Sequence, residues 1–131
     1  MRISYYQKSL KMQQTEFLQN IIFKDLENLN KDPKKKEISC FSEEDFQIVL
    51  ERVEYYGISI YSIESWKSKK SHAISINEDF RKKATDPRWY KKAFLTFKTA
   101  EKKLSYSATY KVSNKLLARE NLSKEINVND K

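Results

Sequence analysis

The stretch from Phe41 to Trp66 constrains the fold more than any other part of this chain. It reads FSEEDFQIVLERVEYYGISIYSIESW, which is the pattern of a helix, a stop and a strand. Ser42 can accept a hydrogen bond from the first turn, and the acidic residues after it suit the positive end of the helix dipole. The apolar residues that follow recur every three or four positions and predict one buried stripe: Phe46, Val49, Leu50, Val53 and Tyr56.

The predicted helix ends at Gly57, the only glycine in the chain. A helix end commonly requires positive φ, which glycine adopts without a steric cost. The apolar, β-branched run from Ile58 to Ile63 predicts a strand with protein on both faces. Glu64 shares a side with Trp66 if this strand is regular. We expect Glu64 either to face solvent or a partner, or to have a basic partner within the protein.

The segment before this stretch predicts a long N-terminal helix over residues 4–30. Its apolar residues keep the helical spacing: Leu10, Phe17, Leu18, Ile21, Ile22, Leu26 and Leu29. Pro33 and the lysines around it predict a charged, solvated connector over residues 31–37. Residues 38–41 are compatible with a short edge strand.

The segment after Trp66 begins with a turn-like KSKKS sequence and an alternating run over residues 72–77, which together predict a β-hairpin. Residues 77–86 predict a charged loop or a short helical turn. Asp86 and Pro87 are typical of a helix start, and the helical spacing then continues to Leu104. A strand over residues 93–99 is the alternative to this helix, and we favour the helix.

The last predicted strand runs from Leu104 to Val112, where apolar and polar residues alternate strictly. Ser113 is placed to cap a short final helix. The element order predicts an α+β fold, in which a small, mostly antiparallel β-sheet is packed by helices. We expect one domain over residues 1–122 and a disordered tail over residues 123–131.

Composition predicts a folded protein with a very polar surface, because 39% of the 131 residues are hydrophobic and 34% are charged. No run of about 18 apolar residues is present and the N-terminus lacks the apolar block of a signal peptide, so we expect a cytoplasmic protein without a membrane partner. The net charge of +8 is unevenly spread: residues 41–65 carry one Lys/Arg and six Asp/Glu, whereas residues 66–131 carry 17 and seven. Such a chain could meet partners of either sign.

Residues of catalytic type are scarce. The chain has one cysteine, Cys40, and one histidine, His72, so an internal disulfide and a multi-cysteine metal site are excluded. A single glycine leaves no phosphate-cradling loop. We therefore expect a protein that is not an enzyme and uses no metal or cofactor, with Cys40 buried as a small apolar side chain.

The capped acidic helix, the glycine stop and the strand of Phe41–Trp66, followed by the hairpin and the DPRWYKKAF helix start, resemble the small immunity proteins that protect bacteria from polymorphic and contact-dependent toxins. The resemblance implies a non-catalytic inhibitor that binds a cognate toxin and blocks its active site. If the toxin is a nuclease, acidic residues of the inhibitor replace phosphate, whereas this chain is basic overall. The partner-binding residues so implied are Glu43, Glu44, Asp45, Glu51, Glu54 and Glu64, and the candidate aromatic anchors are Tyr55, Tyr61, Trp66 and Tyr110.

The alternative function is that of a small basic nucleic-acid-binding protein or a phage-encoded inhibitor. The sequence from Trp66 onward carries cations that could hold phosphates and rings that could stack on bases. The cations in question are Lys67, Lys69, Lys70, Arg81, Lys82, Lys83, Arg88, Lys91 and Lys92.

Overall fold

The computed structural model describes residues 13–120, and the chain divides into two compact units. The larger unit is Asp25–Tyr110, and the smaller unit combines residues 1–24 with residues 111–131. The expectation of one domain over residues 1–122 stays a prediction. The expected tail over residues 123–131 lies outside the described residues.

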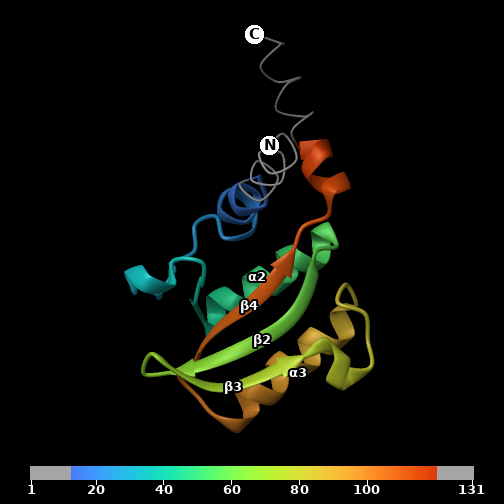
Figure 1. The fold of residues 1–131 in the computed structure, drawn as a ribbon. Helices are drawn as coiled ribbons and strands as arrows, with labels where there is room; N and C mark the ends of the chain where they lie inside the picture. The colour runs from blue at the N-terminus through green and yellow to red at the C-terminus, as the bar shows by residue number, and fades with distance from the viewer. Residues whose placement is uncertain (1–12, 121–131) are drawn as a thin grey trace. The chain divides into compact units, whose positions relative to one another are not determined.

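The larger unit is built on a four-stranded antiparallel sheet with strand order β1-β4-β2-β3 (Figure 1). The strands are β1 (Phe41–Ser42), β2 (Ser59–Lys67), β3 (Lys70–Ile76) and β4 (Ser105–Lys111). The turn between β2 and β3 consists of Ser68 and Lys69, with φ of 51° and 68°. Two successive positive φ values are those of a type I′ turn, whose twist suits a hairpin. The α+β fold and the hairpin are therefore confirmed.

Helix α2 (Glu43–Tyr56) begins and ends as its sequence predicts. The hydroxyl of Ser42 accepts a hydrogen bond from the Asp45 backbone N–H at 3.2 Å. Gly57 adopts the left-handed conformation with φ of 69° and donates its N–H to the Glu54 carbonyl at 3.2 Å. Both ends are thus fixed by local chemistry.

Helix α3 (Pro87–Ala100) includes residues 93–99, so the strand alternative is wrong. The Asp86 side chain accepts a hydrogen bond from the Arg88 N–H at 2.9 Å, and Pro87 occupies the first helical position. Ala93, Phe94 and Phe97 are buried while Leu95 and Thr96 are exposed. This burial follows the helical period and not the alternation of a strand.

Both helices pack on one face of the sheet, which we call the inner face (Figure 1). Phe46 of α2, Phe94 of α3 and Tyr106 of β4 form an aromatic cluster there. The ring centroids are 5.3 Å apart for Phe46 and Phe94, 4.9 Å for Phe94 and Tyr106, and 5.5 Å for Phe46 and Tyr106. Each ring is almost fully buried, so this cluster is the centre of the core.

The opposite, outer face of the sheet is only partly covered and carries both polar and apolar side chains. Ser62, Glu64 and Trp66 of β2 lie there with Ser107 and Thr109 of β4, and Ile74 and Ile76 of β3 pair with Glu64 and Ser62. The Trp66 indole N–H donates to the Ser107 hydroxyl at 2.9 Å, and Ser62 hydrogen-bonds Thr109. The prediction that β2 has protein on both faces is confirmed only in part, because Ile60 and Ile63 are fully buried whereas Ser62, Glu64 and Trp66 are half-buried.

The predicted helix over residues 4–30 is shorter at its C-terminal end. Helical residues extend over 13–17 and the π-helix η1 (Leu18–Ile22), and residues 26–32 are not helical; the predicted start lies outside the described residues. Two asparagines explain the difference. The Asn28 amide oxygen accepts from the Asn30 and Cys40 N–H groups at 2.9 Å, and the Asn30 amide donates to the Lys35 and Ile38 carbonyls. These side chains take backbone bonds that a helix would otherwise make.

Two short 3-10 helices complete the larger unit, η2 (Pro33–Lys35) in the predicted connector and η3 (Asn77–Phe80) after β3. In the smaller unit the Ser113 hydroxyl accepts from the Leu116 N–H at 3.1 Å, which caps the helix over residues 114–120 as predicted. The Gln14 side chain accepts from the Val112 N–H at 2.9 Å. Within residues 13–120, no helix has the length and apolar character needed to span a membrane.

Candidate functional site

The most distinctive exposed feature is a row of side chains along α2, which we call the acidic stripe. Each member lies three or four residues from another member, so they share the helix surface that faces away from the core. They are Glu44, Gln47, Glu51, Glu54 and Tyr55, and all are exposed. Tyr55 is 82% exposed, with its ring edge-on to that of Tyr56 at 5.0 Å.

The carboxylates of the acidic stripe are mostly available for a partner. Glu54 forms an ion pair with Lys91 of α3, and Glu51 accepts a hydrogen bond from Gln47 at 3.4 Å. Among residues 13–120, Glu44 and Glu51 form no ion pair. The stripe therefore projects uncompensated negative charge from a chain whose net charge is positive.

Two other predicted partner-binding residues, Glu43 and Asp45, are half-buried in the first turn of α2. There they complement the helix dipole. The carboxylate of Glu43 also lies close enough to oppose ionisation of Tyr106, whose pKa is raised to about 12, chiefly by burial. These two residues thus have a structural role that the residues of the stripe do not share.

Glu64 and Trp66, the remaining predicted partner-binding residues, lie on the outer face of the sheet and not beside the acidic stripe. Glu64 is half-buried and accepts a hydrogen bond from the Ser71 hydroxyl. Trp66 lines a pocket of about 550 Å³, and the Lys35 ammonium lies 5.7 Å from its ring centroid. Sequence reasoning assigned Lys35 to a solvated connector and missed its place at this pocket.

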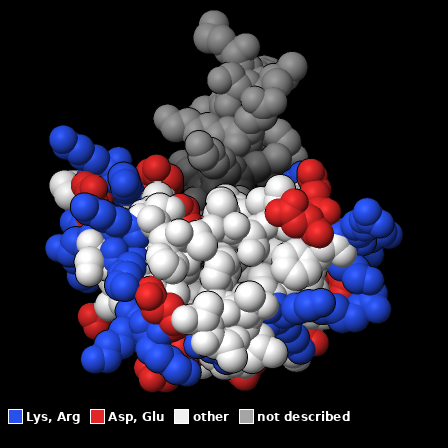
Figure 2. All heavy atoms as spheres, turned by 90° about the horizontal axis from the view of Figure 1, so that it is seen from below, with Lys and Arg blue, Asp and Glu red and all other residues white. Residues whose placement is uncertain are grey.

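The nine predicted nucleic-acid-binding cations are all exposed, but they are dispersed. Three lie in or beside the β2–β3 turn, three follow η3, and three are on α3. Strand β3 separates the first two groups by about 20 Å, given the rise per residue of a strand. Figure 2 views the molecule from below Figure 1, where β3 and α3 lie, and shows Lys and Arg side chains on both sides of a broad uncharged area.

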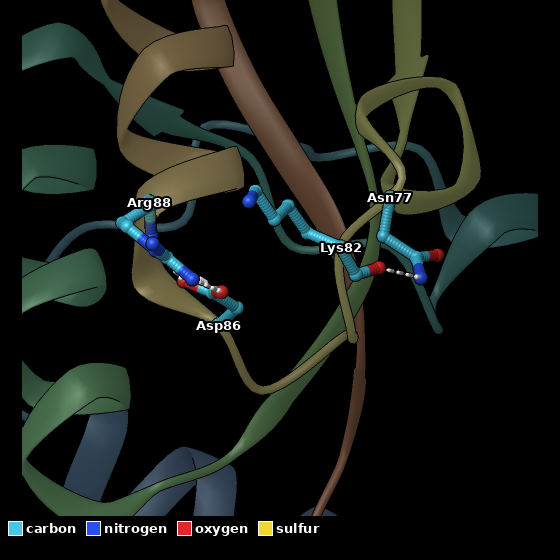
Figure 3. A network of polar contacts seen from close by, with 4 residues as sticks. All are labelled: Asn77, Lys82, Asp86 and Arg88. Carbon is cyan, nitrogen blue, oxygen red and sulfur yellow. Dashed lines mark hydrogen bonds and ion pairs between the residues drawn. The ribbon is translucent and has the colours of Figure 1, made fainter.

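Several of these cations are already paired. The Arg88 guanidinium donates two hydrogen bonds to the Asp86 carboxylate, from Nε to Oδ1 at 3.0 Å and from Nη2 to Oδ2 at 2.7 Å (Figure 3). The hydrogen bonds from Arg88 lower the pKa of Asp86 to about 2. Lys67 pairs with Glu101 at 3.1 Å. Lys82 presents its carbonyl to the Asn77 amide at 2.9 Å and keeps its own ammonium exposed.

Cys40 and His72, the two side chains of catalytic type, have different surroundings. Cys40 is buried, as predicted, and burial raises the pKa of its thiol to about 11, so the thiol is protonated at neutral pH. His72 is exposed and lies 3.6 Å from Glu101. Within the part of the chain that the structure describes, no three His, Cys, Asp or Glu residues converge as a metal site would require.

Comparison with protein-family models, curated proteins and solved structures returns no match for this chain.

Proposed function

We propose that this protein is an immunity protein that binds a cognate bacterial toxin, one that acts on nucleic acid, and blocks its active site. The acidic stripe of α2 is the observation that carries this proposal. It supplies exposed carboxylates at Glu44, Glu51 and Glu54, two of which have no ion pair among residues 13–120. A toxin that cleaves or binds nucleic acid presents a basic groove to phosphates, and this stripe is the complementary surface.

The geometry of the stripe suits such a groove. Side chains three and four residues apart on a helix are roughly 5 to 6 Å apart at Cβ. The stripe is therefore a straight row of negative charge on a rigid element with both ends capped. Rigidity reduces the entropy lost on binding.

Tyr55 would contribute the apolar part of the contact. Its ring is 82% exposed at the C-terminal end of the stripe, next to Glu54 and Glu51. Exposed tyrosines commonly anchor protein interfaces because they bury a large area at a low entropic cost. The charges would then speed encounter, and the ring would slow dissociation.

The test uses the product of the adjacent gene as the partner, expressed as an inducible toxin. Wild-type protein should bind that product and protect cells that express it. In Glu44→Gln/Glu51→Gln the association rate should fall by at least about tenfold at low salt. The glutamines keep the size of the side chains, so the helix should be retained.

A matched control removes the same charge elsewhere. Glu27 and Glu78 are exposed and lie outside α2, so Glu27→Gln/Glu78→Gln should associate at close to the wild-type rate. The proposal fails if wild-type protein neither binds nor protects, or if both variants lose the same amount of affinity.

A second candidate function, that of a small basic nucleic-acid-binding protein or a phage-encoded inhibitor, is favoured by the exposure of all nine cations. It predicts that a labelled oligonucleotide binds with an affinity that falls steeply with salt. Absence of a shift at low salt would remove this candidate.

A further inference from the structure

The Trp66 pocket is a second candidate site, separate from the acidic stripe. Its lining combines six residues from the segment 29–38 with Trp66 of the outer sheet face. Its volume of about 550 Å³ is within the range of small-molecule sites. The lining residues that bear on ligand chemistry are Trp66, Lys31, Lys35, Lys69 and Asp32.

The Trp66 ring is a prepared stacking surface. Its N–H is held by Ser107 at 2.9 Å, which fixes the orientation of the ring, and the side chain is only half-buried. The ammonium of Lys35 lies 5.7 Å from the ring centroid, on a flexible side chain that a planar ligand could displace. The other tryptophan, Trp89, is 1% exposed and belongs to the core.

The charge of the pocket favours an anion. Lys31, Lys35 and Lys69 are exposed and form no ion pair with any residue in the range 13–120. Asp32 is the one acidic residue of the lining, and its carboxylate accepts the Lys34 N–H at 2.9 Å as the cap of η2. The carboxylate of Glu64 also lies close enough to raise the pKa of the Cys40 thiol. Three lysines against these two carboxylates leave a pocket with a net positive charge.

The wall of the pocket is held in place before any ligand binds. The Asn30 amide donates to the carbonyls of Lys35 and Ile38 at 2.7 Å and 2.8 Å, which connects the segment before η2 to the C-terminal end of η2 and the residues after it. Leu29 and Ile38 contribute apolar side chains to the lining, and Cys40 contributes an uncharged thiol. Such preorganisation reduces the entropy cost of binding.

We propose that this pocket binds one nucleotide, with the base stacked on Trp66 and the phosphate held by Lys31, Lys35 and Lys69. Inorganic phosphate would use the lysines alone, and an acidic peptide would leave the ring unmatched. A nucleotide uses both the ring and the cations. The same chemistry is offered by a free nucleotide and by an unpaired nucleotide within an RNA or DNA strand. This inference does not depend on the proposed inhibitor function.

The test titrates wild-type protein with nucleoside monophosphates and with short single-stranded oligonucleotides, at low and high salt, and follows tryptophan fluorescence. Quenching should be saturable, and it should disappear in Trp66→Phe, which leaves Trp89 as the only tryptophan. Quenching by the monophosphates identifies a free nucleotide as sufficient. Quenching by the oligonucleotides alone identifies a nucleotide within a strand.

Two variants test the site itself. Loss of base stacking in Trp66→Ala should lower the affinity by roughly 5- to 150-fold, measured by isothermal titration calorimetry because this variant lacks the fluorescent reporter. Lys35→Gln/Lys69→Gln should lower the affinity and reduce its salt dependence, because two phosphate contacts are removed. Lys102→Gln/Lys115→Gln is the charge-matched control, since both lysines are exposed, lie outside the pocket and are not among the nine candidate nucleic-acid-binding cations, and its affinity should stay within about twofold of wild type.

Three outcomes would overturn the proposal. The first is that no nucleotide or oligonucleotide quenches the wild-type protein. The second is an equal loss in the control and pocket lysine variants, which would indicate non-specific attraction to the basic surface. The third is that an oligo-glutamate peptide binds the pocket as tightly as the nucleotides do, which would identify an acidic peptide as the ligand.

Discussion

Helices α2 and α3 have the same length and lie side by side on the inner face of the sheet, but their exposed sides carry opposite charge. Their buried sides meet through Phe46 and Phe94, whose ring centroids are 5.3 Å apart. Outside, α2 presents the acidic stripe, whereas α3 presents three basic residues, Arg88, Lys91 and Lys92. The ion pair between Glu54 and Lys91 joins the two exposed sides.

The buried sides of the two helices stabilise the fold, whereas their exposed sides determine which partner is bound. The buried side of each helix carries large aromatic rings that serve to pack the helix on the sheet and do not determine which partner the protein binds. Each exposed side contributes little to stability, because exposed ion pairs are worth at most about 1 kcal/mol. We therefore expect substitutions on the buried sides to change the free energy of unfolding and substitutions on the exposed sides to change binding.

The largest effect should come from Phe46→Ala on the buried side of α2. Phe46 is fully buried and its ring contacts those of Phe94 and Tyr106. The cavity should lower the free energy of unfolding by about 3 to 5 kcal/mol, as measured by urea denaturation. Gln47→Ala, one residue away and exposed, should change it by less than about 0.5 kcal/mol. Similar losses of free energy of unfolding in Phe46→Ala and Gln47→Ala would contradict the distinction between the buried and exposed sides of α2.

A smaller effect is expected at the C-terminal end of α2. Gly57 has φ of 69°, and no atom lies within 4 Å of the position its Cβ would occupy. Gly57→Ala should therefore cost about 1 to 2 kcal/mol through backbone strain alone. Gly57→Asn should cost less, because asparagine tolerates this conformation. Equal stability of the alanine variant and wild type would argue against the left-handed cap.

The start of α3 offers a pH-dependent test. Arg88 lowers the pKa of Asp86 from 3.8 to about 2, so the ionised carboxylate stabilises the folded state fully above about pH 4. This stabilisation is lost as the pH falls through about 2. Asp86→Asn keeps a capping side chain but removes the charge. The melting temperature of wild type should exceed that of the variant at neutral pH, and this excess should shrink below about pH 4 and be lost as the pH falls through about 2.

If the melting-temperature difference between wild type and Asp86→Asn were the same at every pH, the contact between Arg88 and Asp86 would be contradicted. Arg88→Gln provides the control. The melting-temperature difference between Arg88→Gln and Arg88→Gln/Asp86→Asn should depend on pH much less than the difference between wild type and Asp86→Asn, because the side-chain hydrogen bonds of Arg88 are absent from both variants.

The smallest effect on stability is expected for Tyr55→Ser in the acidic stripe. Tyr55 is 82% exposed, so the free energy of unfolding should change by no more than about 0.5 kcal/mol. Its dissociation rate from the partner should nevertheless rise, because the ring is the proposed apolar anchor. Loss of stability without loss of binding would place Tyr55 in the fold and not in the interface.

Local chemistry made much of the fold predictable. Ser42, Gly57 and the pair Asp86 and Pro87 fix the ends of α2 and α3 through bonds to their nearest neighbours in sequence, so their roles follow from short patterns. The strict alternation from Leu104 to Val112 likewise predicts β4.

The failures have a shared cause, which is contact between residues distant in the sequence. Asn28 bonds the Cys40 N–H twelve residues away, and this bond diverts a helical pattern into an extended segment. Lys35 comes near Trp66 only because the connector folds back toward the outer face of the sheet. The side of the sheet on which Glu64 lies, opposite to that of α2, depends on how the helices pack on the sheet and does not follow from the sequence pattern of β2.

Two single substitutions of opposite sign, Glu51→Gln on α2 and Lys92→Gln on α3, test the central claim most directly. The measurement is the rate of association with the toxin encoded by the adjacent gene, at low salt. If the acidic stripe meets a basic partner, Glu51→Gln should slow association, and Lys92→Gln should leave it unchanged or increase it. Slower association in Lys92→Gln, with Glu51→Gln unaffected, would contradict the account.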